Sequence, residues 1–138
     1  MLIRTLIGVV LGAAIAASAQ AQSFDGTYAG TRTITVSQSA QGGPAKDCPG
    51  VGGKRTAIEF KVAGGTITLR YKLLSDTAFT GTIGGDGAFT IRAEWPPGSR
   101  NTVTWSGRIK GRRVRGELNS SGPGGGICRG TVTARKRS

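Results

Sequence analysis

Eight short segments of the chain alternate apolar and polar residues, and this period of two constrains the fold more than any other feature. Residues two apart lie on the same face of a strand. In Arg55–Val62, for example, Ile58, Phe60 and Val62 share one face. The alternation therefore predicts eight half-buried strands, at Phe24–Val36, Arg55–Val62, Thr66–Leu73, Thr77–Ile83, Ala88–Trp95, Thr102–Lys110, Arg113–Asn119 and Ile127–Arg135.

Turn residues separate these segments, and the chain contains 24 glycines in 138 residues, more than twice the usual share of about 7%. Gly64-Gly65 and Gly84–Gly87 are short hairpin turns, whereas residues 39–54 form a longer polar loop. Strands joined by hairpins pair antiparallel. We therefore predict an all-β fold, an up-and-down barrel of about eight antiparallel strands, with a two-sheet β-sandwich as the alternative.

A short pattern, large-x-Gly-x-Ile, occurs at residues 79–83 and again at residues 105–109. In a strand, the large residue and the glycine would face the same side. Alternating large and small residues fill the tapered interior of a small barrel, and glycine permits strong coiling of the sheet. We interpret the pattern as a packing repeat rather than a binding motif.

The first 21 residues have the features of an export signal. Arg4 supplies the positive charge, Leu6–Ala17 a short apolar run and Ala19-Gln20-Ala21 a small-x-small cleavage site. The apolar run is shorter than the roughly 20 residues that a membrane-spanning helix needs, so no integral span is expected. We predict a signal peptide at 1–21, a single β-barrel domain at 22–138, and a periplasmic or secreted bacterial location.

The chain has two cysteines, Cys48 in the 39–54 loop and Cys128 at the start of the last segment. An even number of cysteines in an oxidising compartment favours a disulfide. A Cys48–Cys128 bridge would tie the first long loop to the last strand and so support closure of a barrel. A redox or metal role is disfavoured, because there is no CxxC motif and no histidine.

Basic residues are the main candidate for function. The chain carries 19 Lys and Arg against 7 Asp and Glu, a formal net charge of +12. Basic residues form one cluster at 108–115 and another at 135–137. If the last two strands are neighbours, the two clusters would share one wall of the barrel and attract polyanions. A solvated surface that only keeps the protein soluble is the alternative. The candidate binding residues are Arg108, Lys110, Arg112, Arg113, Arg115, Arg135, Lys136 and Arg137.

An enzyme is not expected, and no catalytic residue, metal ligand or cofactor is assigned. Histidine, the commonest general base, is absent. Glu59, Glu94 and Glu117 fall on outward positions beside Lys or Arg, where cross-strand ion pairing accounts for them. The remaining carboxylates lie in or beside turns, where Asp is common. No nucleophile elbow, phosphate loop or paired-carboxylate motif occurs.

Arg32 is the one residue that disagrees with the alternation, because it has the same parity as Tyr28, Ile34 and Val36, which are expected to face the interior. A regular strand would therefore point Arg32 inward, where it would need a partner such as an acidic ligand or a carboxylate. A β-bulge at Gly30 would instead turn Arg32 outward. We favour the bulge, or a position of Arg32 at the barrel rim, over a buried arginine.

The start of the predicted domain, Phe24-Asp25-Gly26-Thr27-Tyr28-Ala29-Gly30, together with a late Cys-Arg-Gly at Cys128, resembles small exported proteins of alphaproteobacteria. That resemblance implies no activity. Gly26-Thr27-Tyr28 combined with a late arginine, Arg129 or Arg135, is also faintly similar to lipocalins and avidins, which have Trp where this chain has Tyr28. The second resemblance implies a barrel with a ligand-binding mouth and does not identify a ligand.

Three functions remain open at this point. The first is an exported, non-enzymatic module that binds anionic polysaccharide or lipopolysaccharide through its basic face. Nucleic acid is a weaker candidate partner, because Phe60, Tyr71, Trp95 and Trp105 have inward parity and leave no platform for stacking bases. The second function is a barrel that holds a small apolar ligand. The third is a protein inhibitor or adaptor that uses the 39–54 loop. The sequence leaves the oligomeric state open.

Overall fold

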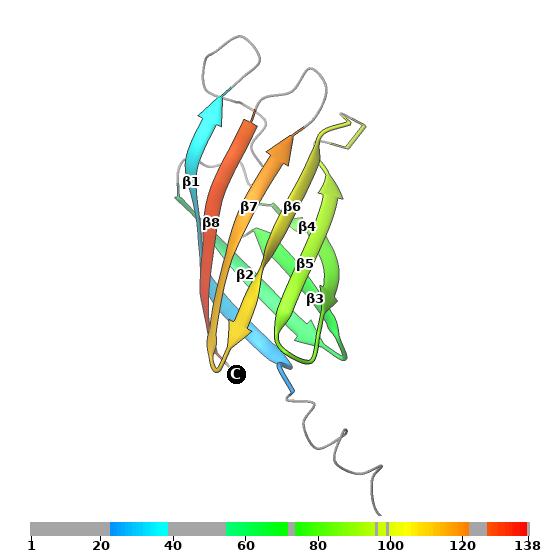
Figure 1. Ribbon diagram of the computed structural model, residues 1–138, viewed down its shortest axis with the longest axis vertical. Coiled ribbons are helices and arrows are strands. Elements are labelled where there is room, and N and C mark those ends of the chain that lie inside the picture. The colour runs from blue at the N-terminus through cyan, green and yellow to red at the C-terminus, as the bar shows by residue number, and fades with distance from the viewer. Residues whose placement is uncertain are drawn as a thin grey trace, which may run out of the picture.

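Eight antiparallel strands close into a barrel in which each strand pairs with its neighbours in the chain (Figure 1). The computed structural model describes residues 23–38, 55–71, 74–95, 97–98, 100–121 and 127–137. The strands are β1 (Gly26–Gln38), β2 (Arg55–Ala63), β3 (Thr66–Tyr71), β4 (Leu74–Ile83), β5 (Ala88–Glu94), β6 (Thr102–Lys110), β7 (Arg113–Ser121) and β8 (Ile127–Lys136).

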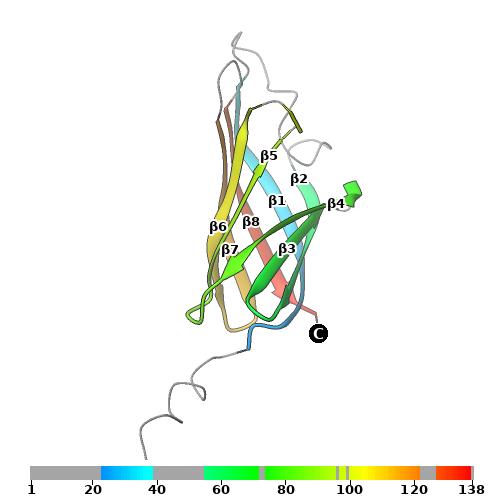
Figure 2. The same ribbon diagram turned by 90° about the vertical axis from the view of Figure 1, so that its right-hand side faces the viewer.

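The barrel closes where β1 pairs with β8. Tyr28 is the register partner of Phe60 on β2 and of Lys136 on β8, so β1 is paired along both edges. Figure 2 shows β1 and β8 side by side at the back of the barrel. A closed sheet leaves no free edge strands. The predicted barrel is therefore confirmed, and the two-sheet sandwich is not the fold that forms.

All eight predicted segments coincide with strands, and their bounds differ from those observed by at most three residues. The largest difference is in β4, which begins at Leu74 rather than Thr77 because Leu74 pairs with Tyr71 of β3 after an irregularity in the register. Gly64 and Gly65 form the β2–β3 turn with φ of 56° and 82°. Positive φ at both positions suits a tight hairpin turn, which is why glycine occupies them.

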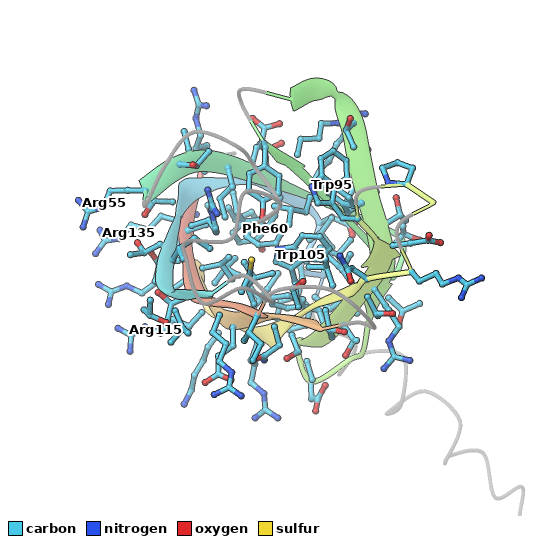
Figure 3. The ribbon with its side chains drawn as sticks, turned by 90° about the horizontal axis from the view of Figure 1, so that it is seen from above. Arg55, Phe60, Trp95, Trp105, Arg115 and Arg135 are labelled. Carbon is cyan, nitrogen blue, oxygen red and sulfur yellow. The ribbon has the colours of Figure 1, made fainter. Side chains whose placement is uncertain are left out.

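The barrel interior is filled with side chains. Trp105 and Tyr71 are fully buried, and Phe79 is 5% exposed. The rings of Phe79 and Trp105 lie 4.7 Å apart between centroids, and those of Phe60 and Phe89 lie 5.7 Å apart. Figure 3 shows Phe60 and Trp105 inside the ring of strands. Stacked and tilted aromatic rings at these distances add to the stabilisation from area burial.

Glycines on the inner face let neighbouring strands approach closely. A side chain at Gly107 would overlap the backbone of Arg115 and Gly116 on β7, and one at Gly81 would overlap the backbone of Thr90 and Ile91. Gly81 and Gly107 are the glycines of the repeated large-x-Gly-x-Ile pattern. The repeat therefore acts in packing, as interpreted from the sequence.

The expectation for Arg32 was wrong. The register of β1 against β8 is regular across Gly30 and shifts only between Ile34 and Val36. Arg32 therefore points inward and is 1% exposed, whereas Val36, expected inside, is 42% exposed. The bulge lies between Ile34 and Val36 rather than at Gly30, so it reverses the facing of Val36 and leaves that of Arg32 unchanged.

Arg32 is held by polar and aromatic groups of the interior. Its Nη2 donates a hydrogen bond to Thr56 Oγ1 at 2.6 Å, and its guanidinium lies 5.5 Å from the centroid of the Tyr71 ring. A cation over an aromatic face is stabilised when desolvated. Burial lowers the pKa of Arg32 from its usual value, and the charge of Tyr71 opposes that shift.

Cys128 lies on β8 and is 2% exposed, opposite Ser120 of β7. Cys48, the 39–54 loop and the predicted signal at 1–21 are outside the described residues. The disulfide and the cleavage site therefore stay predictions.

The hydroxyl of Tyr71 gives the first testable prediction. Trp105 Nε1 donates a hydrogen bond to this hydroxyl at 3.0 Å, and both side chains are fully buried. Substituting Tyr71→Phe keeps the ring but leaves the buried indole N–H without its acceptor. We expect a loss of about 1–3 kcal/mol in the free energy of unfolding, measured by urea denaturation.

The pH dependence of stability provides the control. Burial raises the pKa of Tyr71 to about 12, because the phenolate is disfavoured inside the barrel. A raised folded-state pKa contributes stability that is complete below the unfolded value near 10 and is lost as pH rises through about 12. The wild type should lose about 2–3 kcal/mol more than Tyr71→Phe across that interval. Equal alkaline losses would contradict this role of Tyr71.

Candidate functional site

The outer faces of β6, β7 and β8 carry a dense group of positive charges, which we call the basic wall. It consists of five exposed side chains that alternate with buried ones along each strand. Their alkyl stems and charges point to solvent because the intervening residues, such as Ile109, Val114 and Ala134, face the core. The basic wall residues are Arg108, Lys110, Arg113, Arg115 and Arg135.

Three pairs of like charges lie directly opposite one another in the basic wall. Arg108 is the register partner of Arg115, and Lys110 is the partner of Arg113. Arg113 is also the partner of Arg135 on β8. Like charges in such positions repel each other and destabilise a sheet by a fraction of a kcal/mol to about 1 kcal/mol per pair. The pairing of β7 with β8 thus brings together the two clusters that the sequence places apart.

Acidic residues near the basic wall offset little of this charge. Arg108 forms an ion pair with Asp86 at 3.6 Å, but both side chains are more than 60% exposed, at 62% and 66%. Exposed ion pairs contribute little to stability. Glu117 faces outward between Ser106 and Thr131, one pleat repeat from Arg115. The wall therefore keeps a strong positive field.

The other three predicted binding residues lie at its margin. Arg112 is in the β6–β7 turn, where its Nη2 donates to the carbonyl oxygen of Lys136 at 3.3 Å. Lys136 is half-buried at the end of β8. The backbone N–H of Arg137 donates to the carbonyl of Thr27 at 2.7 Å, which carries Arg137 towards β1. The predicted group thus divides into the wall and this rim.

Sequence inspection missed a hollow of about 290 Å³ at the edge of the basic wall, where β7, β8 and β1 meet. Arg113, Arg115 and Arg135 line it together with Thr31 and Thr133. The threonines carried no signal in the sequence, since outward threonines are common in strands. Their relation to the arginines depends on the register of three strands, two of which are far apart in the chain.

Two further observations describe the rest of the molecule. Within residues 23–38, 55–71, 74–95, 97–98, 100–121 and 127–137, no group of three or more His, Cys, Asp or Glu side chains is placed to hold a metal ion. The same part of the chain contains no helix long and apolar enough to cross a membrane.

Comparison of the sequence with models of known protein families finds no match, and comparison with curated proteins finds none either.

The like-charge pairs give the second testable prediction. Arg113 faces positive partners on both sides, so Arg113→Gln should raise the free energy of unfolding by about 0.2–1 kcal/mol at low salt. The gain should shrink near 1 M salt, where the Debye length falls to about 3 Å. Urea denaturation at both salt concentrations measures it.

Arg92→Gln on β5 is the matched control. Arg92 is exposed, and its register partner on β6 is the neutral Thr104. This substitution should leave stability unchanged at either salt concentration. A salt-independent loss of stability in Arg113→Gln would show that repulsion does not govern the wall.

Proposed function

We propose that this protein is an exported, non-enzymatic binding module that engages anionic polymers of the bacterial envelope or its surroundings through the basic wall. The observation that carries the proposal is the set of three directly opposed like-charge pairs on one outer face. Evolution rarely retains such local conflicts without a compensating gain, and they are expected at functional sites. A bound polyanion would attract both positive side chains of each pair and so offset the repulsion between them.

The electrostatics of the surface support binding to a long polymer more than to an isolated ion. A wall of fixed positive charge attracts a polyanion over a distance and accelerates its association. Binding then releases the counterions that the polymer had condensed, as it does for other polyelectrolytes. Both effects weaken steeply with added salt.

Anionic polysaccharide or lipopolysaccharide fits this surface better than nucleic acid. Single-stranded nucleic acid is usually gripped by exposed aromatic rings on which bases stack. In this protein every aromatic side chain is buried or half-buried, and the least covered, Phe24 and Trp95, pack against the core. A polymer recognised by its charged substituents needs no such platform.

The interior weighs against an apolar-ligand barrel of the lipocalin kind. Trp105, Phe79 and Phe89 occupy the space that a ligand would need, and Trp95 packs on Phe79 with ring centroids 5.6 Å apart. Small eight-stranded barrels have interiors just wide enough for side chains. The adaptor function remains a separate hypothesis, since the 39–54 loop on which it depends is outside the described residues.

Binding to sulfated and phosphorylated polymers is the third testable prediction. The purified protein should bind heparin and lipopolysaccharide at low salt, with affinity falling steeply as salt increases, measured by isothermal titration or fluorescence anisotropy. Arg108→Gln combined with Arg115→Gln should weaken binding and lower the slope of log affinity against log salt by about one per charge removed.

Arg70→Gln combined with Arg92→Gln removes the same charge from β3 and β5 and is the matched control. It should leave the affinity close to that of the wild type. Binding that does not vary with salt, or equal losses in the two double variants, would overturn the proposal.

Export and the disulfide belong to the same proposal and give the fourth prediction. If Cys48 and Cys128 are bridged, both cysteines of the native protein should resist alkylation until a reductant is added. The bridge closes a loop of about 80 residues, which should stabilise the fold by roughly 4 kcal/mol. Urea denaturation with and without reductant measures this difference. Rapid alkylation of the unfolded, unreduced protein would show that the bridge is absent.

A further inference from the structure

The hollow at the edge of the basic wall is built from two rows of residues that cross three strands. In one row, Arg113 of β7 is the partner of Arg135 of β8, which is the partner of Ala29 of β1. In the next row, Arg115 is the partner of Thr133, which is the partner of Thr31. Three arginines therefore lie beside three small residues on one outer face.

The difference in side-chain size creates the hollow. Ala29, Thr31 and Thr133 leave space that the long arginine side chains border. The floor is backbone, because the register partners Gly30 and Ala134 face the interior and place no side chain on the outer face. Figure 3 shows Arg115 and Arg135 projecting from the same side of the barrel.

The size of the hollow limits what it can hold. Its volume of about 290 Å³ is at the lower end of the roughly 300–1,000 Å³ found for ligand pockets. It therefore suits one charged substituent and part of the sugar that carries it, rather than a whole polymer chain. Glu59 of β2 is the partner of Ala29 and places a negative charge beyond the third strand, so the favourable field ends there.

We propose that this hollow is a subsite for a single tetrahedral oxyanion ester, a phosphate or sulfate group carried on the polymer. The inference rests on the proposed function and adds the class of group recognised. A guanidinium presents a planar fork that donates two parallel hydrogen bonds to such a group. The hydroxyls of Thr31 and Thr133 add donors of a different direction. A carboxylate can also accept one guanidinium fork, but its two oxygens lie in one plane, so it uses fewer of these donors in total.

Charge-preserving substitutions distinguish a subsite from a diffuse positive wall. Arg113→Lys combined with Arg135→Lys keeps the charge but removes the two forks. The matched control is Arg108→Lys, which is on the same wall but does not line this hollow. Unchanged melting temperatures will show that both variants fold, as expected for exposed positions.

The probes are heparin oligosaccharides, which are sulfated, and oligogalacturonates of equal net charge, which carry only carboxylates. The wild type should bind the sulfated oligomer more tightly. The double variant should lose about tenfold in affinity for it, corresponding to about 1.4 kcal/mol. It should lose less affinity for the carboxylate oligomer, which uses fewer of the guanidinium donors. Lipopolysaccharide, compared before and after enzymatic dephosphorylation, tests the phosphate source separately from the sulfate source.

The outcomes separate the two proposals. If neither oligomer nor lipopolysaccharide binds, the proposed function fails. If both oligomers bind equally well and the double variant matches Arg108→Lys, the basic wall is a polyanion surface and the subsite is wrong. Equal weakening of sulfated and carboxylated binding in the double variant would also overturn the proposed preference for tetrahedral esters.

Discussion

The whole barrel is built around the pairing of β1 with β8. Ten residue pairs join the first strand to the last, so the ends of the domain hold each other in register. This contact closes the barrel and removes the free edges that an open sheet would expose. It also sets Ala29 and Thr31 beside Arg135 and Thr133. In this way barrel closure adds residues of β1 to a proposed site whose arginines lie on β7 and β8.

The interior is filled with side chains that contact one another, and for this reason our proposal places binding on the outer surface. The hydroxyl of Tyr71 accepts a hydrogen bond from the indole N–H of Trp105, and the ring of Tyr71 lies against the guanidinium of Arg32. A buried arginine is costly unless its donors and charge are compensated. Thr56 and the ring of Tyr71 provide compensation from two different strands. Contacts inside the barrel thus link Thr56, Arg32, Tyr71 and Trp105.

The basic wall differs from the interior, because side chains of like charge face each other on neighbouring strands. The positive charge of Arg113 is opposed by Lys110 on one side and Arg135 on the other. Such an arrangement lowers the stability of the free protein a little while raising its attraction for polyanions. A sheet that is closed and densely packed inside tolerates this cost.

Alternation and turn chemistry are local properties. For this reason the strands, their antiparallel order and the inward parity of residues such as Phe60 and Trp105 could be predicted from the sequence. The facing of Arg32 and Val36 could not be predicted in this way, because the position of the bulge depends on how β1 pairs with β8. The sequence also placed Arg113 and Arg115 on one hairpin. That Thr31 and Ala29 complete a hollow with them depends on barrel closure, a contact between residues about a hundred positions apart that no local pattern encodes.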